Sequence, residues 1–165
     1  MNIIDNLRAI LLSLWLGAAL FFSVAVAPNV FAVLRGFALV NANEIAGSIV
    51  TRTLAVINVA GFILGLLVLL LTISLKKRFG MISLGLQILT VAVLITTTGL
   101  GQWVIAARMR ALRGAMGTID LVPLSDPRHL AFTQLHVYSV TVMGVAMIAA
   151  IIGILAIALS NRRHQ

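Results

Sequence analysis

The sequence contains no cysteine and only four acidic residues among its 165. Without cysteine, disulfides, thiolate metal sites and cysteine nucleophiles are all excluded. The four acids are Asp5, Glu44, Asp120 and Asp126, and each falls outside the long apolar stretches of the chain. Proton-driven transporters and di-iron bundles place carboxylates inside the membrane or the bundle. We therefore expect neither a buried carboxylate relay nor a carboxylate metal centre. Phosphate-binding loops, nucleophile elbows and HExxH or Rossmann motifs are also absent from the sequence.

Charge of either sign is scarce, at 10% of residues, whereas hydrophobic residues make up 61%. Soluble domains carry about a quarter charged residues. The apolar residues form four runs, at 9–34, 54–75, 81–107 and 135–159. Each run has the ~20 residues needed to cross a hydrocarbon core ~30 Å thick. We therefore predict an all-α polytopic membrane protein, a single membrane domain over residues 1–165 folded as an up-and-down bundle of four transmembrane helices.

The first run begins after Asp5 and Arg8, which we expect at the membrane edge. Pro28 lies near the far end of this run and clashes with the carbonyl of Val24, so a kink or an early exit is predicted there. Residues 25–27 imitate a signal-peptide cleavage site. Because the run is too long for a signal peptide and continues beyond Pro28, we predict a retained transmembrane helix.

The connections between the runs predict the topology. Residues 76–78 are three adjacent cations in a tight turn, which makes the second and third helices antiparallel neighbours. The third helix is expected to continue out of the bilayer through residues 108–113. A loop helix is expected near residues 127–135, beginning at Pro127 with Asp126 as its N-cap. Basic residues divide evenly between the two membrane faces. The cationic turn favours an inner (plasma) membrane protein with both termini in the cytoplasm.

The net charge of +8 indicates which partners to expect. On a membrane protein it favours anionic lipid headgroups, at about 1 kcal/mol per basic residue near the surface, over nucleic acid. Gly61 and Gly65 form a GxxxG motif in the second run. Small residues also follow one stripe of the fourth run, at Ser139, Ala146, Ala150 and Gly153. Both patterns predict close helix contacts, and both also permit a homo-oligomer.

Polar residues concentrate on the membrane face that carries the two long connections, 35–53 and 108–134. This face holds Glu44, Arg52, Asn58, Arg108, Arg110, Arg113, Asp120, Asp126, Arg128, His129 and His136. One interpretation is a rim that contacts headgroups through scattered ion pairs. The other is a shallow polar site roofed by the loops.

Within the third run, Gln87, Thr98 and Gln102 share one helix face, which should point into the bundle because amides in lipid need partners. A polar path for a solute is the alternative. We take His136, Arg108, Asn58, Gln87 and Gln102 as the candidate ligand-binding residues.

His136 stands where the fourth run enters the membrane, and such a histidine could ligate a metal or haem, donate to a ligand, or bond a neighbouring loop. His129 lies seven residues earlier, ~10.5 Å along a helix, so the two cannot share one small metal ion. A haem held by two histidines would need His164 from the opposite face. Met143 and Met147, one turn apart, are possible Cu(I) ligands with His136, although methionine is common in apolar cores. No cofactor is therefore expected, with haem or copper as the alternative.

Two segments resemble a known family. One reads LWLGAALFF at residues 14–22 and is followed by Pro28; the other reads FTQLHVYSV at residues 132–140. The chain resembles the domain of unknown function 4149, the bacterial relatives of transmembrane protein 205, and is more distantly similar to copper-resistance D and HemJ-type haem proteins. The resemblance implies a four-helix membrane bundle and hints at metal or drug handling. HemJ-type proteins carry an axial histidine where this chain has Arg8.

The resemblance places Trp15, Gly17, Pro28 and His136 at matching positions. Structural roles are expected for Trp15, Gly17, Pro28, Gly61, Gly65 and Ser139. The favoured function is non-enzymatic handling of a small solute, metal ion or drug, or assistance to a partner that does this. The alternatives are a structural or assembly protein and a haem- or metal-binding membrane oxidoreductase.

Overall fold

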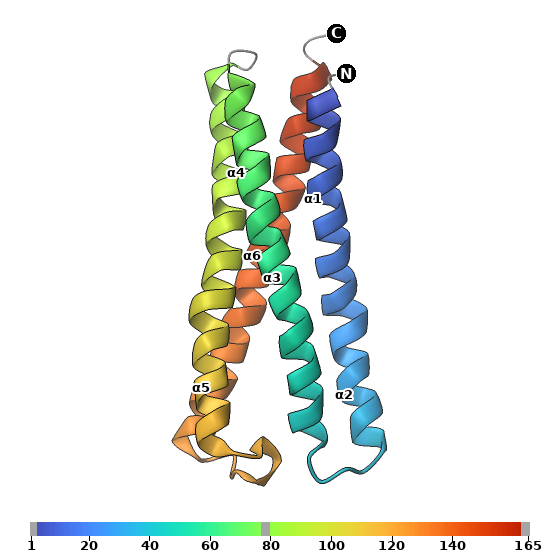
Figure 1. The fold of residues 1–165 in the computed structure, drawn as a ribbon, viewed down its shortest axis with the longest axis vertical. Helices are drawn as coiled ribbons and strands as arrows, with labels where there is room; N and C mark the ends of the chain where they lie inside the picture. The colour runs from blue at the N-terminus through green and yellow to red at the C-terminus, as the bar shows by residue number, and fades with distance from the viewer. Residues whose placement is uncertain (1–2, 77–79, 163–165) are drawn as a thin grey trace.

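A computed structural model describes residues 3–76 and 80–162, which fold as four long helical rods. The rods comprise α1 (Ile3–Phe21), the π-helix η1 (Phe22–Val26) and α2 (Ala27–Gly36); α3 (Ala42–Ser74); α4 (Met81–Gly99), the π-helix η3 (Leu100–Ile105) and α5 (Ala106–Met116); and α6 (Pro127–Arg162). A short 3-10 turn, η4 (Ile119–Leu121), lies in the last connection. The helix α1 begins and α6 ends at the same end of the bundle, here the terminal end, and the connections 37–41 and 117–126 form the opposite, loop end (Figure 1).

All four rods are long and apolar enough to cross a membrane. They span 33 to 36 residues, with mean hydropathies between 1.8 and 2.8 over their most apolar windows. The chain is therefore a multi-pass membrane protein, and the predicted all-α four-helix bundle is confirmed. A helix of this length measures ~50 Å at 1.5 Å per residue, so its ends extend beyond a ~30 Å hydrocarbon core into the headgroup layer.

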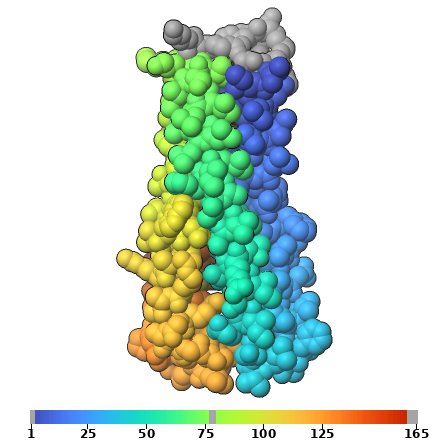
Figure 2. All heavy atoms as spheres, in the orientation of Figure 1, coloured from blue at the N-terminus to red at the C-terminus, as the bar shows by residue number. Residues whose placement is uncertain are grey.

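The packing of the rods changes from one end of the bundle to the other. The prediction that the second and third helices are neighbours is confirmed, since α3 packs along α4, although turn residues 77–79 lie outside the described part. At the terminal end α6 lies beside α1, whereas towards the loop end it lies beside α5 and away from α2 (Figure 1). On the face drawn in Figure 2, the surface is hollowed between α3 and α5 towards the loop end. The bundle is therefore tight at one end and splayed at the other.

Pro28 does not end the first helix, so of the two predicted outcomes, a kink or an early exit, the early exit does not occur. The chain passes through η1 immediately before it and continues as α2, with proline in the first turn. Within η1, the N–H of Ala27 bonds the carbonyl of Phe22, five residues back. The wider π turn accommodates the proline ring, which in a regular α-helix would collide with the carbonyl four residues earlier.

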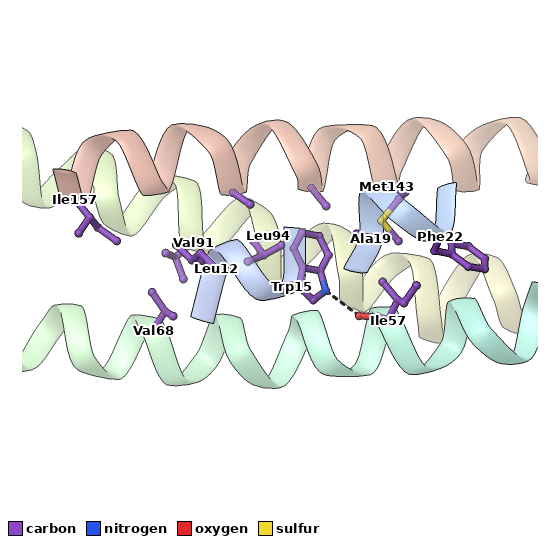
Figure 3. Close-up of a cluster of buried hydrophobic side chains, with 12 residues drawn as sticks. Leu12, Trp15, Ala19, Phe22, Ile57, Val68, Val91, Leu94, Met143 and Ile157 are labelled. Atoms are coloured by element: carbon purple, nitrogen blue, oxygen red, sulfur yellow. Dashed lines mark hydrogen bonds between the residues drawn. The ribbon is translucent and has the colours of Figure 1, made fainter. Parts of the chain in front are cut away.

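The core of the tight end forms around Trp15. Trp15 is 3% exposed, and its indole N–H donates to the carbonyl of Ile57 at 2.9 Å (Figure 3). A Cβ on Gly61 would lie 2.5 Å from the indole nitrogen, so α1 and α3 approach this closely only because residue 61 is glycine. A Cβ on Gly65 would likewise lie 2.7 Å from the Cγ1 atom of Ile95 in α4. By contrast, a side chain at Gly17 would meet nothing within 4 Å.

The stripe on α6 meets two other helices. Ala146 and Ala150 are each 1% exposed. A Cβ at Gly153 would contact Thr90 of α4 at 3.3 Å and Leu12 of α1 at 3.5 Å. Small residues therefore allow α6 to lie close to both helices.

Candidate functional site

An apolar cleft of about 440 Å³ lies where the helices splay. Its walls come from η1, α2, α3, α5 and α6. Among the described residues that line it, four have polar side chains: Ser23, Thr51, His136 and Ser139. A volume of a few hundred Å³, mostly apolar walls and a small number of polar groups are typical of small-molecule sites.

The cleft has a buried floor and an exposed rim. Phe22 and Met143 belong to the floor, being 6% and 7% exposed, and they stand at the end of the core nearest the loop end (Figure 3). Pro28 on α2 and His136 and Val140 on α6 are exposed lining residues. The mouth therefore lies between α2 and α6 and opens sideways, at the side of helices that span the membrane.

One π-helical segment lines the cleft and the other ends directly before it. Phe22 and Ser23 belong to η1, and Ala106 is the first residue of α5, directly after η3. Insertions of this kind shift the register of the helix that follows and are frequent at functional sites. Pro28 gave a sequence signal for irregularity near η1, but nothing in the sequence indicated η3.

The structure brings three of the predicted metal and ligand residues together. His136, Met143 and Met147 line the cleft, and so does Met109 of α5, which the sequence analysis missed. Arg108, predicted as a ligand-binding residue, is exposed on α5 and is not among the described lining residues. Consecutive residues on a helix point about 100° apart, which is why Met109 faces the cleft and Arg108 does not.

The other predicted site residues lie elsewhere. Asn58 is 3% exposed and packs on η3, with its amide nitrogen 3.2 Å from the position of a Cβ on Gly101. Gln102 is half-buried, and its Oε1 is enclosed without a hydrogen-bond partner in the described part of the chain. Gln87 lies 15 residues earlier, ~22 Å away along the helix. The five candidates therefore do not form one site.

A buried polar cluster occupies the terminal end, and the sequence analysis did not predict it. Asp5 and Arg8 are 2% and 0% exposed, so they are enclosed by the bundle. Arg8 pairs with Asp5 and donates to Thr72 of α3 and Gln87 of α4, each at 2.8 Å. Because α1 begins at Ile3, the two charges share a face at i and i+3. Their pairing and the neutral acceptors make burial tolerable.

At the loop end, the connection between α5 and α6 caps the N-terminus of α3, the helix that follows the connection 37–41. Asn41, which precedes α3, makes no side-chain cap. Instead, the carboxylate of Asp120 accepts from the backbone and side-chain nitrogens of Asn43, at 3.3 and 2.6 Å, and from the N–H of Glu44 at 2.9 Å. An anion at a helix N-terminus satisfies free N–H groups and opposes the helix dipole. Asp120 therefore ties the two connections together.

Glu44 links the same connection to α5. It accepts from the N–H of Ile119 at 3.4 Å and lies 3.6 Å from the guanidinium of Arg113. Arg113 also packs over Gly47 and over the ring of Phe132, 5.4 Å from its centroid. The network joins α3, α5 and α6 across the wide end of the bundle.

Asp126 caps α6, as predicted. It accepts from the N–H of Arg128 at 2.8 Å and pairs with the guanidinium of the same residue at 2.7 Å. The hydrogen bond from the Arg128 side chain, followed by the one from its backbone N–H, lowers the pKa of Asp126 from 3.8 to about 2.

The fold and the cleft together define a multi-pass membrane protein with an apolar cleft at its side. Residues 10–118 match the family described as Domain of unknown function (DUF4149). The match covers more than half of the chain, which therefore belongs to this family. It ends before α6, so His136, Met143 and Met147 lie outside the matched residues. No curated protein and no solved structure matches the chain.

Proposed function

We propose that this protein binds a small apolar molecule, which enters the cleft sideways from the hydrocarbon layer of the membrane. The observation that carries the proposal is the cleft itself, about 440 Å³ in volume and lined mainly by apolar side chains. The exposed rim at Pro28 and Val140 provides the route of access from the side. Handling of a small solute or drug is the general activity that such a site would serve.

The ligand would be held mainly by contact with apolar walls. His136 at the rim and Ser139 one turn further along α6 supply hydrogen-bonding groups that would orient a ligand carrying one polar end. With mainly apolar walls and so few polar groups, a binding role is proposed in preference to catalysis.

The cleft can be filled by one substitution. Gly144 lines it, and a Cβ at this position would meet nothing within 4 Å, so Gly144→Leu should place its side chain in the cleft without moving a helix. Gly85→Leu is the matched control, because Gly85 is an exposed helical glycine that also has nothing within 4 Å and does not line the cleft. Both variants gain the same helix propensity, ~1 kcal/mol.

The test is photolabelling of the reconstituted protein with an alkyl diazirine, read by mass spectrometry of residues 136–147. We expect saturable labelling that an excess of unreactive alkane competes away. Gly85→Leu should retain this labelling and Gly144→Leu should lose it. Labelling that does not saturate and is equal in all three proteins would contradict the proposal.

Copper handling is a second candidate, favoured by one observation. Met109, Met143, Met147 and His136 line the same cleft, and thioether and imidazole groups suit Cu(I). A competition titration of Cu(I) between the protein and a chelator tests it. Cu(I) uptake that is lost in both Met143→Leu and His136→Ala would support a copper site, whereas uptake that is unchanged in both would exclude one.

We also propose that the protein lies in the inner (plasma) membrane with both termini in the cytoplasm. The argument for this orientation is the cationic run at residues 76–78, which is difficult to translocate. The chain has no native cysteine, so Met81→Cys, 90% exposed at the terminal end, and Leu124→Cys, 77% exposed at the loop end, can report the orientation. In intact cells, an impermeant maleimide should label position 124 and not position 81. The opposite pattern would reverse the orientation.

A further inference from the structure

A second, polar pocket lies directly beyond the apolar cleft. It has a volume of about 570 Å³ at the loop end, and its polar side chains are Arg35, Asn43, Asp120 and His129. The helices α2, α3 and α6 contribute to both the cleft and this pocket. The two hollows are therefore arranged one after the other along the same three helices.

The offset between them can be followed on each helix. Arg35 lies four residues beyond Phe31 of the cleft, and His129 lies seven residues before His136, which corresponds to ~6 and ~10 Å along the helix axes. The Arg35 guanidinium stacks on the Phe31 ring, 5.4 Å from its centroid, and so bridges the two hollows. A ligand of two parts could occupy both, with about 10 Å between their centres.

The charges at the loop end favour an anion in the polar pocket. Asp120 is engaged at both oxygens by the start of α3, Glu44 pairs with Arg113, and Asp126 pairs with Arg128. In the described part of the chain, Arg35 makes one hydrogen bond, from Nε to Asn43 at 2.8 Å, and its terminal nitrogens remain for a ligand.

His129 adds a second donor to the pocket. Its Nδ1 is buried, with no hydrogen-bond partner in residues 3–76 and 80–162. A guanidinium and an imidazole at one concave site are the groups that recognise a phosphate.

We infer that the molecule bound in this protein is one anionic phospholipid, with an acyl chain in the apolar cleft and its phosphate at Arg35 and His129. The orientation is the one a lipid of this leaflet already has, because the polar pocket lies at the helix ends and the cleft leads from it towards the bilayer centre. The inference rests on the proposed function, since the acyl chain takes the place of the small apolar ligand.

The test is native mass spectrometry of the protein released from nanodiscs that contain equal amounts of phosphatidylglycerol and phosphatidylcholine. We expect one retained lipid with a preference for phosphatidylglycerol. Arg35→Gln should reduce this preference roughly fivefold, because Arg35 attracts the net negative charge of phosphatidylglycerol, whereas phosphatidylcholine has the same phosphate but no net charge. Arg35→Lys should keep most of it. Arg52→Gln is the control, because Arg52 is exposed on α3 and lines neither hollow.

The variants separate failure of the lipid inference from failure of the proposed function. If Arg35→Gln and Arg52→Gln keep the wild-type preference, or if phosphatidylcholine is retained equally, the inference is overturned. Saturable diazirine labelling in Arg35→Gln would then still support the apolar site. Added inorganic phosphate is a further test. If it abolishes the difference in phosphatidylglycerol preference between the wild type and Arg35→Gln while the amount of retained lipid is unchanged, the pocket binds a free anion and the inference is again wrong. Loss of the retained lipid in Gly144→Leu, with Gly85→Leu unaffected, supports placing the acyl chain in the cleft.

Discussion

The indole nitrogen of Trp15 lies 2.9 Å from the carbonyl oxygen of Ile57 and joins α1 to α3 at the centre of the bundle. Gly61 lies one turn further along α3, beneath the same indole ring. The bond satisfies a donor that would otherwise be buried in an apolar core, and the glycine makes room for the ring. This contact holds the tight half of the bundle, from which the helices splay to form the cleft.

Gly61→Ala should destabilise the protein. The added Cβ would lie 2.5 Å from the Trp15 nitrogen and 2.9 Å from a Thr98 methyl group, so both side chains must move. We expect a loss of about 1–3 kcal/mol, measured as a lower midpoint of thermal unfolding in detergent. Gly85→Ala is the control and should be neutral or slightly stabilising, because nothing lies within 4 Å of it. Equal midpoints for the two variants would contradict the packing described.

Arg8→Met should be among the most destabilising single substitutions. It leaves Asp5 buried at 2% exposure without its cation, a change that typically costs about 3–5 kcal/mol. The double variant Asp5→Leu with Arg8→Met removes both charges and should recover much of the loss. The unfolding midpoints of Asp5→Leu, Arg8→Met and the double variant give the coupling energy between the two residues. Additive effects would show that the two residues act independently.

Asp120→Ala should loosen the loop end while leaving the core intact. Loss of the carboxylate removes the acceptor of three hydrogen bonds from Asn43 and Glu44, at a cost of about 1 kcal/mol. Hydrogen exchange should accelerate at residues 43–46 and 117–122. Leu121→Ala, at a position 70% exposed in the same connection, is expected to leave exchange at residues 43–46 unchanged. Unaltered exchange in Asp120→Ala would show that α3 does not depend on this cap.

The start of α6 should loosen in acid. The pKa of Asp126 is lowered from 3.8 to about 2 in the folded protein, so its stabilising contribution is present above the ordinary value and is lost as the pH falls towards about 2. Hydrogen exchange of residues 128–131, corrected for its intrinsic pH dependence, should show this loss over that interval. Asp126→Asn keeps an N-cap acceptor but does not titrate, so its protection should not change with pH there. The same pH response in both proteins would exclude Asp126 as the cause.

The apolar runs predicted the four membrane helices because length and hydropathy are properties of the sequence itself. The Asp126 cap and the continuation of the third helix through α5 could be predicted for the same reason, since both depend on local residues. The burial of Asp5 and Arg8 inside the bundle was not predicted, because nothing in the local sequence indicates it. Their burial depends on acceptors 64 and 79 positions away from Arg8, at Thr72 and Gln87.

The cleft could be predicted only in part. His136, Met143 and Met147 were singled out by residue type and spacing on one helix, and all three line it. The other walls, with Phe31 and Met109, depend on where α2 and α5 lie relative to α6, which no local pattern indicates. The joining of the two connections through Asp120 and Asn43 is likewise a tertiary property.

The location of a bound apolar ligand tests the central claim most directly. A crystal structure of the protein grown with a brominated alkyl compound would reveal the ligand by the anomalous signal of bromine. We predict a bromine peak between α2 and α6, in contact with Phe31 and Met143. Bromine peaks found only on the outer, lipid-facing surfaces of the helices, with the cleft filled by side chains, would contradict the account.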